Sequence, residues 1–193
     1  MDGLSLILIF AIIKKTQEME LKQINTRDSQ YYSFVETLLI DSFPKNEYRD
    51  LCDFRDYTDS NPLFHNNIIL EKDQLLGFIT YWNFPKFTYV EHFAIDKSMQ
   101  GKGYGAFSLY LLKNIISDPI ILEVELPLNT QASRRVKFYT RQGFKLWNNY
   151  YEQPPYRSSD DFYPMSLMAY GDLQNSTDFK DVRNTIYREV YGA

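Results

Sequence analysis

The spacing of apolar and polar positions changes several times along the chain, and each change predicts a different element. Apolar residues alternate with polar ones in strands, whereas they recur every three or four positions in amphipathic helices. Capping residues, prolines and turn residues then set the boundaries. In the first half we expect a strand at 20–24, helices at 28–40 and 44–54, a loop at 56–62, and strands at 65–71, 75–84 and 88–95. The last three runs are joined by short turns, which favours an antiparallel meander.

The second half alternates helix and strand patterns and ends in an amphipathic segment. We expect helices at 103–117 and 131–142, strands at 120–126, 144–151 and 164–170, and a final helix from 177. Gly143 follows the second of these helices, where a C-terminal glycine is common. Phe179, Val182, Ile186 and Val190 recur at helical spacing in the tail. The whole pattern predicts an α/β protein with a mixed sheet.

The N-terminal region stands apart from this pattern. Residues 4–13 are almost all apolar and are followed by two lysines. A membrane-spanning helix needs about 20 apolar residues, so this stretch is too short to span. It also lacks the basic start and small-residue cleavage site of a secretory signal. We therefore expect 1–18 to be an extension, 19–172 to be the functional domain, and 173–193 to be a helical tail docked on it. A packed extra element or a peripheral membrane contact through 4–13 are the alternatives.

Composition narrows the class of protein. With 193 residues, of which 44% are hydrophobic, the chain can bury a sizeable core without a metal or a disulfide. The formal charge of −4 argues against a nucleic-acid-binding protein, which needs a basic face. Cys52 is the single cysteine, so no intrachain disulfide forms, and a reducing, cytoplasmic location is expected. The two histidines and the cysteine show no metal-site spacing, so we expect no bound metal.

Three of the eight glycines fall within residues 100–105, between the strand 88–95 and a helix. Glycine allows a ligand to approach the backbone closely, and a helix N-terminus offers unpaired N–H groups and a positive dipole end. The segment also matches the looser dinucleotide fingerprint, with Glu123 as an acidic partner. However, residues 96–100 separate the strand from the glycines, and Glu123 lies inside its strand. A purely structural turn is the other alternative.

Two motifs resemble those of the GCN5-related N-acetyltransferase (GNAT) superfamily. The first is Gln100-x-x-Gly103-x-Gly105, and the second is Tyr139-x-x-x-Gly143-Phe144. The resemblance covers about residues 19–170, including the order of strands and helices. It implies a central, mostly antiparallel sheet flanked by helices, with an amphipathic helix at the C-terminus.

The resemblance also implies acetyl-coenzyme A as the acyl donor. The pantetheine arm would pair with the main chain of the strand before the glycine turn, like an added strand. The pyrophosphate would bind backbone N–H groups at the start of the following helix. Relatives often carry an asparagine seven residues before the motif tyrosine, where this chain has Ala132. The implied cofactor-binding residues are Phe93, Ala94, Ile95, Gln100, Gly101, Lys102, Gly103, Tyr104, Gly105, Ala106, Asn129 and Arg135.

The implied reaction is direct attack of a neutral amine on the thioester. Tyr139 is then the acid that protonates the departing thiolate, because its phenol is protonated at neutral pH. Glu91 is the first candidate for the base. His92 is expected to point to the opposite face of its strand, because side chains alternate along strands. Glu123 and Glu125 are further candidates, and a mechanism without a dedicated base stays open.

We expect the acceptor to be a small-molecule or peptide amine, bound between the first two helices and the loops at 82–88 and 150–163. These regions supply an aromatic set suited to cation–π contact with an amine. Its members are Tyr31, Tyr32, Trp82, Phe84, Tyr150, Tyr151 and Tyr156. A homodimer is left open. The competing interpretations are a non-catalytic acyl-CoA-binding regulatory module of the same fold and a membrane-associated partner protein that uses 4–13.

Overall fold

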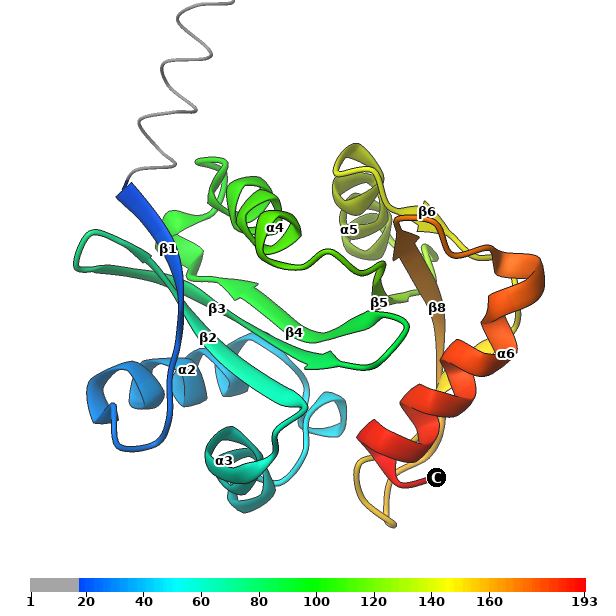
Figure 1. Cartoon of the computed structure of the whole chain (residues 1–193), viewed down its shortest axis with the longest axis horizontal. Helices are drawn as coiled ribbons and strands as arrows, with labels where there is room; N and C mark the ends of the chain where they lie inside the picture. The colour runs from blue at the N-terminus through cyan, green and yellow to red at the C-terminus, as the bar shows by residue number, and fades with distance from the viewer. Residues whose placement is uncertain (1–17) are drawn as a thin grey trace, which may run out of the picture.

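The computed structural model describes residues 18–193, so the apolar stretch at 4–13 and its membrane contact lie outside the described residues. A single sheet runs through the middle of the molecule with helices on both faces (Figure 1). Its strands are β1 (Met19–Gln23), β2 (Phe64–Glu71), β3 (Gln74–Asn83), β4 (Thr88–Ile95), β5 (Ile120–Glu125), β6 (Lys145–Leu146), β7 (Tyr151–Gln153) and β8 (Tyr163–Tyr170). The sheet order is β1-β2-β3-β4-β5-β8-β6, with β7 also paired to β8.

Within the described residues 18–193, five α-helices and three short helical turns connect or cover these strands. The helices are α2 (Ser29–Ser42), α3 (Leu51–Ser60), α4 (Tyr104–Ile115), α5 (Thr130–Arg141) and α6 (Asn175–Ile186). The turns are the 3₁₀ helices η1 (Lys45–Glu47) and η2 (Lys97–Met99) and the π-helical turn η3 (Tyr187–Tyr191). Helices α2, α3 and α6 share one core cluster with the sheet, whereas α4 and α5 pack on the opposite face. Among residues 18–193, no helix is long and apolar enough to cross a membrane.

The sheet is mixed and mostly antiparallel, as expected. Every strand pair is antiparallel except β4 with β5. This parallel ladder holds only three residue pairs, the last of which is Val90 with Leu122. Beyond it, β4 stays paired with β3 as far as Ile95, and β5 stays paired with β8 as far as Glu125. The two strands therefore part in the middle of the sheet, and no strand of the described residues pairs with the β5-facing edge of β4 after Val90.

Two expected boundaries were wrong, and local polar contacts explain the first. The helix expected at 44–54 begins only at Leu51, and it continues to Ser60 through most of the expected loop at 56–62. Thr58 and Ser60 look like loop residues in the sequence. In the structure their hydroxyls donate to carbonyls four residues earlier, at 2.8 and 2.5 Å, so both side chains are accommodated within the helix.

The strand expected at 144–151 is also divided in two. Within this stretch two short strands, β6 and β7, pair with β8, and the residues between them are not strand. Trp147 follows β6, where its N–H still donates to the Leu167 carbonyl at 2.9 Å. Its side chain is buried against Phe179 of α6, with their ring centroids 6.2 Å apart. The four apolar tail residues that share a helical face, Phe179, Val182, Ile186 and Val190, are all buried in the same core cluster.

A bulge in β4 changes which side chains face the same way. Thr80 pairs with His92 and Tyr81 pairs with Val90, so Glu91 has no partner on β3. One extra residue in a strand shifts the alternation of side chains by one position. The side chains of Glu91 and His92 consequently lie on the same face, where both contact Tyr156. The expectation that His92 points to the opposite face was therefore wrong, because it assumed a regular strand.

Candidate active site

A cavity of about 830 Å³ opens where β4 and β5 part. One wall is the residues of β4 from Val90 to Ile95, and the opposite wall includes Leu122 and Glu123 of β5. The glycine turn and the first turn of α4 close one end, and α5 lies across the top of the parted strands. The end of α2, η1 and the segment after β7 border the other end through Asp41, Ser42, Phe43, Glu47, Gln153 and Tyr156.

The glycine turn, residues 100–105, is bonded to the end of β4. Gly101 and Gly103 have φ of +77° and +82°, in the left-handed region that glycine adopts without strain. Gly103 caps α4, and Gly103, Tyr104 and Gly105 line the cavity, so the N-terminus of this helix faces it. The Gln100 amide donates to the carbonyl of Ile95 at 2.9 Å and ties the turn to the strand. The arrangement suits an anion beside an extended ligand.

A glycine in β3 allows the end of β4 to take this position. A Cβ on Gly77 would lie 2.2 Å from the Ala94 carbonyl oxygen and 3.0 Å from the Ile95 Cα. Real Cβ atoms do not approach backbone this closely, so only glycine fits. The sequence analysis missed this residue, although a glycine inside a strand pattern often marks a close backbone approach.

Four basic side chains line the cavity, namely Lys97, Arg134, Arg135 and Arg141. Arg135 forms an ion pair with Glu125 at 2.8 Å and also borders a smaller pocket with Asp41 and Glu47, toward the end away from the glycine turn. The α4 N-terminus adds positive charge at the glycine turn. A phosphate-bearing ligand is therefore complementary to this cavity.

Most of the expected cofactor residues meet in this cavity. The lining includes Phe93, Ala94, Ile95, Gln100, Gly101, Gly103, Tyr104, Gly105, Ala106 and Arg135. Lys102 and Asn129 are not part of the lining. Asn129 instead caps α5, where its side-chain oxygen accepts from the Ala132 N–H at 2.8 Å. Lys102 lies on the outer side of the turn, with Nζ 3.6 Å from the Met99 sulfur.

Tyr139 reaches the cavity from α5. Its ring packs against Phe138 and Phe144, and the residue is 8% exposed. Burial raises the pKa of its hydroxyl to about 12, although the charge of Arg135 opposes that rise. Tyr139 is therefore protonated at neutral pH. Within residues 18–193 its hydroxyl makes no hydrogen bond to the protein, which leaves the proton available to a ligand.

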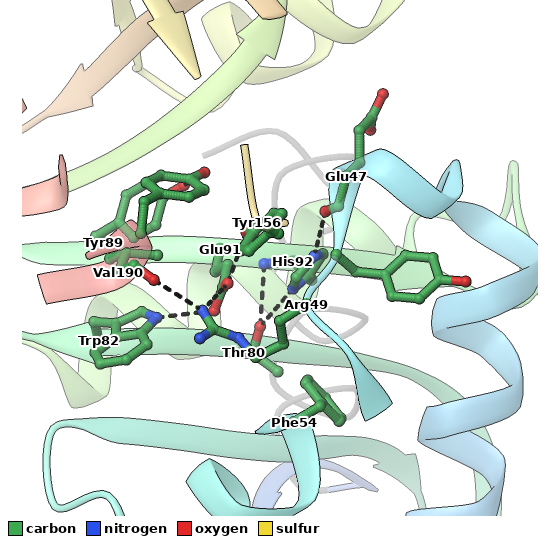
Figure 2. A network of polar contacts seen from close by, with 12 residues as sticks. Glu47, Arg49, Phe54, Thr80, Trp82, Tyr89, Glu91, His92, Tyr156 and Val190 are labelled. Carbon is green, nitrogen blue, oxygen red and sulfur yellow. Dashed lines mark hydrogen bonds and ion pairs between the residues drawn. The ribbon is translucent and has the colours of Figure 1, made fainter. Parts of the chain in front are cut away.

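Both carboxylate oxygens of Glu91 accept hydrogen bonds from side chains of the protein (Figure 2). Its Oε1 accepts from Arg49 at 2.5 Å and from the Tyr156 hydroxyl at 2.7 Å, while Oε2 accepts from the Trp82 indole at 2.8 Å. The side chain is fully buried. Burial alone would raise the pKa of Glu91, but the Arg49 charge and these donors outweigh it and hold the pKa below its usual value. Glu91 is therefore ionised and paired.

Arg49 and the contacts of His92 were not foreseen. Arg49 is 4% exposed and lies among aromatic rings, with its guanidinium carbon 4.5 Å from the Tyr57 centroid. No motif or spacing marks it in the sequence. The His92 Nε2–H donates to the Glu47 carbonyl at 2.9 Å, and burial lowers the pKa of its imidazole (Figure 2). A buried, neutral His92 thus fixes η1 against β4.

Glu123 faces the cavity from β5 in a different environment. It accepts hydrogen bonds from the hydroxyls of Tyr151 and Tyr191, the latter at 2.9 Å, and no cation pairs with it among the described residues. Burial raises the pKa of Glu123 to about 7, although the tyrosine hydrogen bonds act against that rise. A half-buried carboxyl with this pKa exchanges a proton readily at neutral pH.

Of the expected aromatic acceptor set, only Tyr156 lines the cavity. Tyr32, Trp82, Phe84 and Tyr151 are buried in the core, and Tyr150 is exposed on the surface with 77% of its area accessible. Core packing therefore accounts for most of this set. Among the described residues, no three His, Cys, Asp or Glu side chains gather as a metal site.

The arrangement defines a class of enzyme. An open strand edge beside a glycine turn can hold an extended, phosphate-bearing thioester, and a protonated phenol and a carboxyl near neutrality in the same cavity are groups that can transfer protons. This is the geometry of an acyltransferase. The sequence profile described as the acetyltransferase (GNAT) family matches residues 23–144. The chain belongs to the GNAT family of acetyltransferases.

Solved structures agree with this membership. A protein assigned to the GNAT family of acetyltransferases from Bacteroides thetaiotaomicron is 47% identical, with a TM-score of 0.88 over 90% of this chain and 99% of that chain. An acetyltransferase from Salmonella typhimurium that modifies the N-terminal serine of ribosomal protein L7/L12 is 17% identical, with a TM-score of 0.62 over 81% of this chain and 96% of the other.

Arabidopsis thaliana Naa50, in complex with the bisubstrate analogue CoA-Ac-MVNAL, is 15% identical, with a TM-score of 0.58 over 80% of this chain and 99% of that chain. The last two similarities concern the fold alone. No curated protein matches this sequence.

Proposed function

We propose that the protein is an N-acetyltransferase that moves the acetyl group of acetyl-coenzyme A to a primary amine. The observation that carries this proposal is the parting of β4 and β5, because it brings an open strand edge, the glycine turn, Tyr139 and Glu123 into one cleft. A regulatory module that only binds acyl-CoA needs the first two features. It has no use for the two proton-transfer groups.

The residues near the glycine turn fit the cofactor. Gly101 lines the cavity, and a Cβ there would meet nothing within 4 Å, so a ligand can approach the backbone at this residue. Main-chain groups of Phe93 to Ile95 would hold the pantetheine arm, the N–H groups of 103–106 the pyrophosphate, and Arg134 and Arg135 further phosphate oxygens. When bound, the thioester supplies an acyl carbon that a neutral amine attacks, and a main-chain N–H near Ala94 or Ile95 would stabilise the oxyanion.

Two proton transfers accompany the exchange of the C–S bond for a C–N bond. Tyr139 donates its phenolic proton to the departing thiolate, since its raised pKa keeps the hydroxyl protonated at neutral pH. A carboxylate on the acceptor side takes the proton that the amine must lose. Glu91, the first choice from sequence, stays a prediction for this base, but its ion pair with Arg49 disfavours it. The contacts of Glu123 favour Glu123 instead.

The acceptor is proposed to arrive as a cation. The cavity end away from the glycine turn carries Asp41, Glu47 and Glu123 together with the Tyr156 ring, and Arg135, which is paired with Glu125, lies beside Asp41 and Glu47. The carboxyls outnumber this cation, so a protonated amine is attracted and then loses its proton next to the thioester. Peptide and small-molecule amines both satisfy this requirement, and the structures of Naa50 and the L7/L12-modifying enzyme add support for a peptide N-terminus. The cytoplasmic location and the homodimer stay predictions.

Thermal unfolding of the full chain with and without acetyl-coenzyme A tests the donor. At about 100 times its dissociation constant a ligand of the native state adds about 2.7 kcal/mol, which raises the midpoint by roughly 5–10 °C. Gly103→Leu, which places a side chain at a left-handed residue of the turn, should abolish the rise. Release of free thiol in the presence of a panel of amines then tests transfer. A rise without release by any amine would favour the regulatory module, and no rise with folded protein would refute the proposal.

A further inference from the structure

The last turn of the chain contacts a residue that lines the cavity. Helix α6 runs along the sheet on the side of β8 (Figure 1) and continues into η3, whose Tyr191 hydroxyl meets Glu123. The turn is π-helical, with the Gly192 N–H bonded to the Tyr187 carbonyl five residues before it. π-Helical turns are rare and occur mostly at functional sites. Val190 is buried in this turn, with 4% of its area exposed.

Tyr191 connects this turn to the acceptor side. Its hydroxyl donates to Oε2 of Glu123 at 2.9 Å and lies 3.2 Å from the Tyr89 hydroxyl. Its ring packs 4.8 Å from that of Tyr156, the same tyrosine that donates to Glu91. One residue earlier, the Val190 carbonyl lies 3.5 Å from Nη2 of Arg49 (Figure 2).

These contacts exceed what anchoring of the helix requires. Phe179, Val182, Ile186 and Val190 already bury an apolar face of the C-terminal segment. The Tyr191 hydroxyl adds no apolar area, and its partner is a carboxyl that lines the cavity without a cation beside it. Hydrogen bonds to a carboxylate favour its charged form and fix its orientation. The hydroxyl thus acts on Glu123 rather than on the packing of the helix.

We propose that Tyr191 is a positioning residue of the active site, which orients Glu123 as the base toward the acceptor amine and favours its ionised form. This inference rests on the proposed function. The C-terminal turn is then part of the acceptor side, although it lies outside the segment matched by the family profile. Tyr151 holds the other oxygen of Glu123, so the two hydroxyls fix the carboxylate from both sides.

Tyr191→Phe tests the inference because it removes one oxygen atom and keeps the ring. Without this donor the charged form of Glu123 is less stable, so its pKa rises. A base must be deprotonated, so the acidic limb of kcat/KM against pH should move to higher pH, by about one unit, the size expected for a hydrogen bond to a charged group. Tyr187→Phe is the matched control, since its hydroxyl lies in the same turn but donates to the Glu152 carbonyl at 2.6 Å.

A second readout does not depend on turnover. The carboxyl carbon of Glu123 can be followed by NMR against pH in ¹³C-labelled protein, with Glu123→Gln to assign the signal. The inference predicts a midpoint near that of the pH profile and an upward shift in Tyr191→Phe but not in Tyr187→Phe. Equal titrations in native protein and in Tyr191→Phe would overturn the inference. An upward shift in a protein that transfers no acetyl group to any amine would support the hydrogen-bonding role and refute the proposed function instead.

Discussion

Glu91 and Glu123 each lie one residue beyond the last pair of the parallel ladder, on the two strands that part there. The protein holds these two carboxyls in opposite states. Glu91 is paired with a buried arginine, which keeps its pKa low, whereas Glu123 has only tyrosine hydroxyls, and burial raises its pKa to about 7. At equivalent backbone positions, Glu91 on β4 is thus a permanently charged structural residue, whereas Glu123 on β5 can gain and lose a proton near neutral pH.

Glu123 should make the protein less stable as pH rises. Its pKa is raised from 4.5 to about 7 in the folded state, so its stabilising contribution is fully present below pH 4.5 and is lost as pH rises through 7. The loss is about 3 kcal/mol for a shift of this size. Glu123→Gln cannot titrate, so its stability relative to native protein should increase by about that amount between pH 4.5 and 8.

Denaturant unfolding at several pH values measures this difference. Glu20→Gln, which removes an exposed carboxyl from β1, controls for the loss of one charge. A constant difference between native protein and Glu123→Gln across the range would show that Glu123 titrates as an ordinary carboxyl.

Tyr139→Phe should lower kcat and leave cofactor binding unchanged. The ring that packs between Phe138 and Phe144 is retained, while the proton donor for the thiolate is lost. General acids contribute about 10²- to 10⁴-fold, and a fall of at least 10² is expected here. Steady-state kinetics with acetyl-coenzyme A and a reactive amine provide the measurement. Tyr170→Phe, whose ring also packs on Phe144 but does not line the cavity, should keep native kinetics.

Gly77→Ala should weaken acetyl-coenzyme A binding from a distance. The new Cβ would overlap the Ala94 carbonyl at 2.2 Å, so β4 must shift at the residues proposed to hold the pantetheine arm. We expect a loss of about 1–3 kcal/mol in stability, as for overpacked sites, and at least a tenfold rise in the dissociation constant measured by calorimetry. Gly192→Ala, where a Cβ would meet nothing within 4 Å but φ is +69°, is the control for backbone strain without overlap. Native affinity in Gly77→Ala would contradict this role.

Arg49→Met should be strongly destabilising, because it leaves Glu91 buried without its cation. Removal of one partner from a buried ion pair costs about 3–5 kcal/mol, and the unfolding midpoint should fall by roughly 10 °C. Arg55→Met breaks the Glu36 ion pair, in which the arginine side chain is 51% exposed. That loss should stay below about 1 kcal/mol. Equal effects of the two substitutions would show that burial of the Arg49 pair has no energetic consequence.

The sequence predicted the order of the elements, and most of the residues that the resemblance implied for the cofactor line the cavity. Periodicity carries the first kind of information locally, whereas Gln100, Gly103 and Tyr139 were assigned from the two family motifs. Asn129 shows the limit of this approach. A residue near a motif was assigned to the cofactor, but its side chain caps the helix that it precedes.

The acceptor side was harder to predict because it depends on contacts between distant segments. Arg49 and Glu91 are 42 positions apart, and the hydroxyl of Tyr191 meets Glu123 across 68. The bulge at Glu91 adds a further difficulty, since nothing in the β4 sequence signals it and it reverses the face of His92. The face of His92 depends on one extra residue in β4, and the contacts of Arg49 and Tyr191 depend on distant partners, so local spacing in the sequence predicts neither.

The three-pair ladder between β4 and β5 also divides the sheet mechanically. Strands β1 to β4 form one half of the sheet and β5 to β8 the other. The ladders β2–β3, β3–β4 and β5–β8 within these halves are longer than the β4–β5 ladder that joins them. A thioester bound along β4 would bridge the two halves where the hydrogen bonds between β4 and β5 stop. Ligand binding should then make the connection between the two halves more rigid. We expect slower amide hydrogen exchange at 91–95 and 120–125, with little change in the other strands.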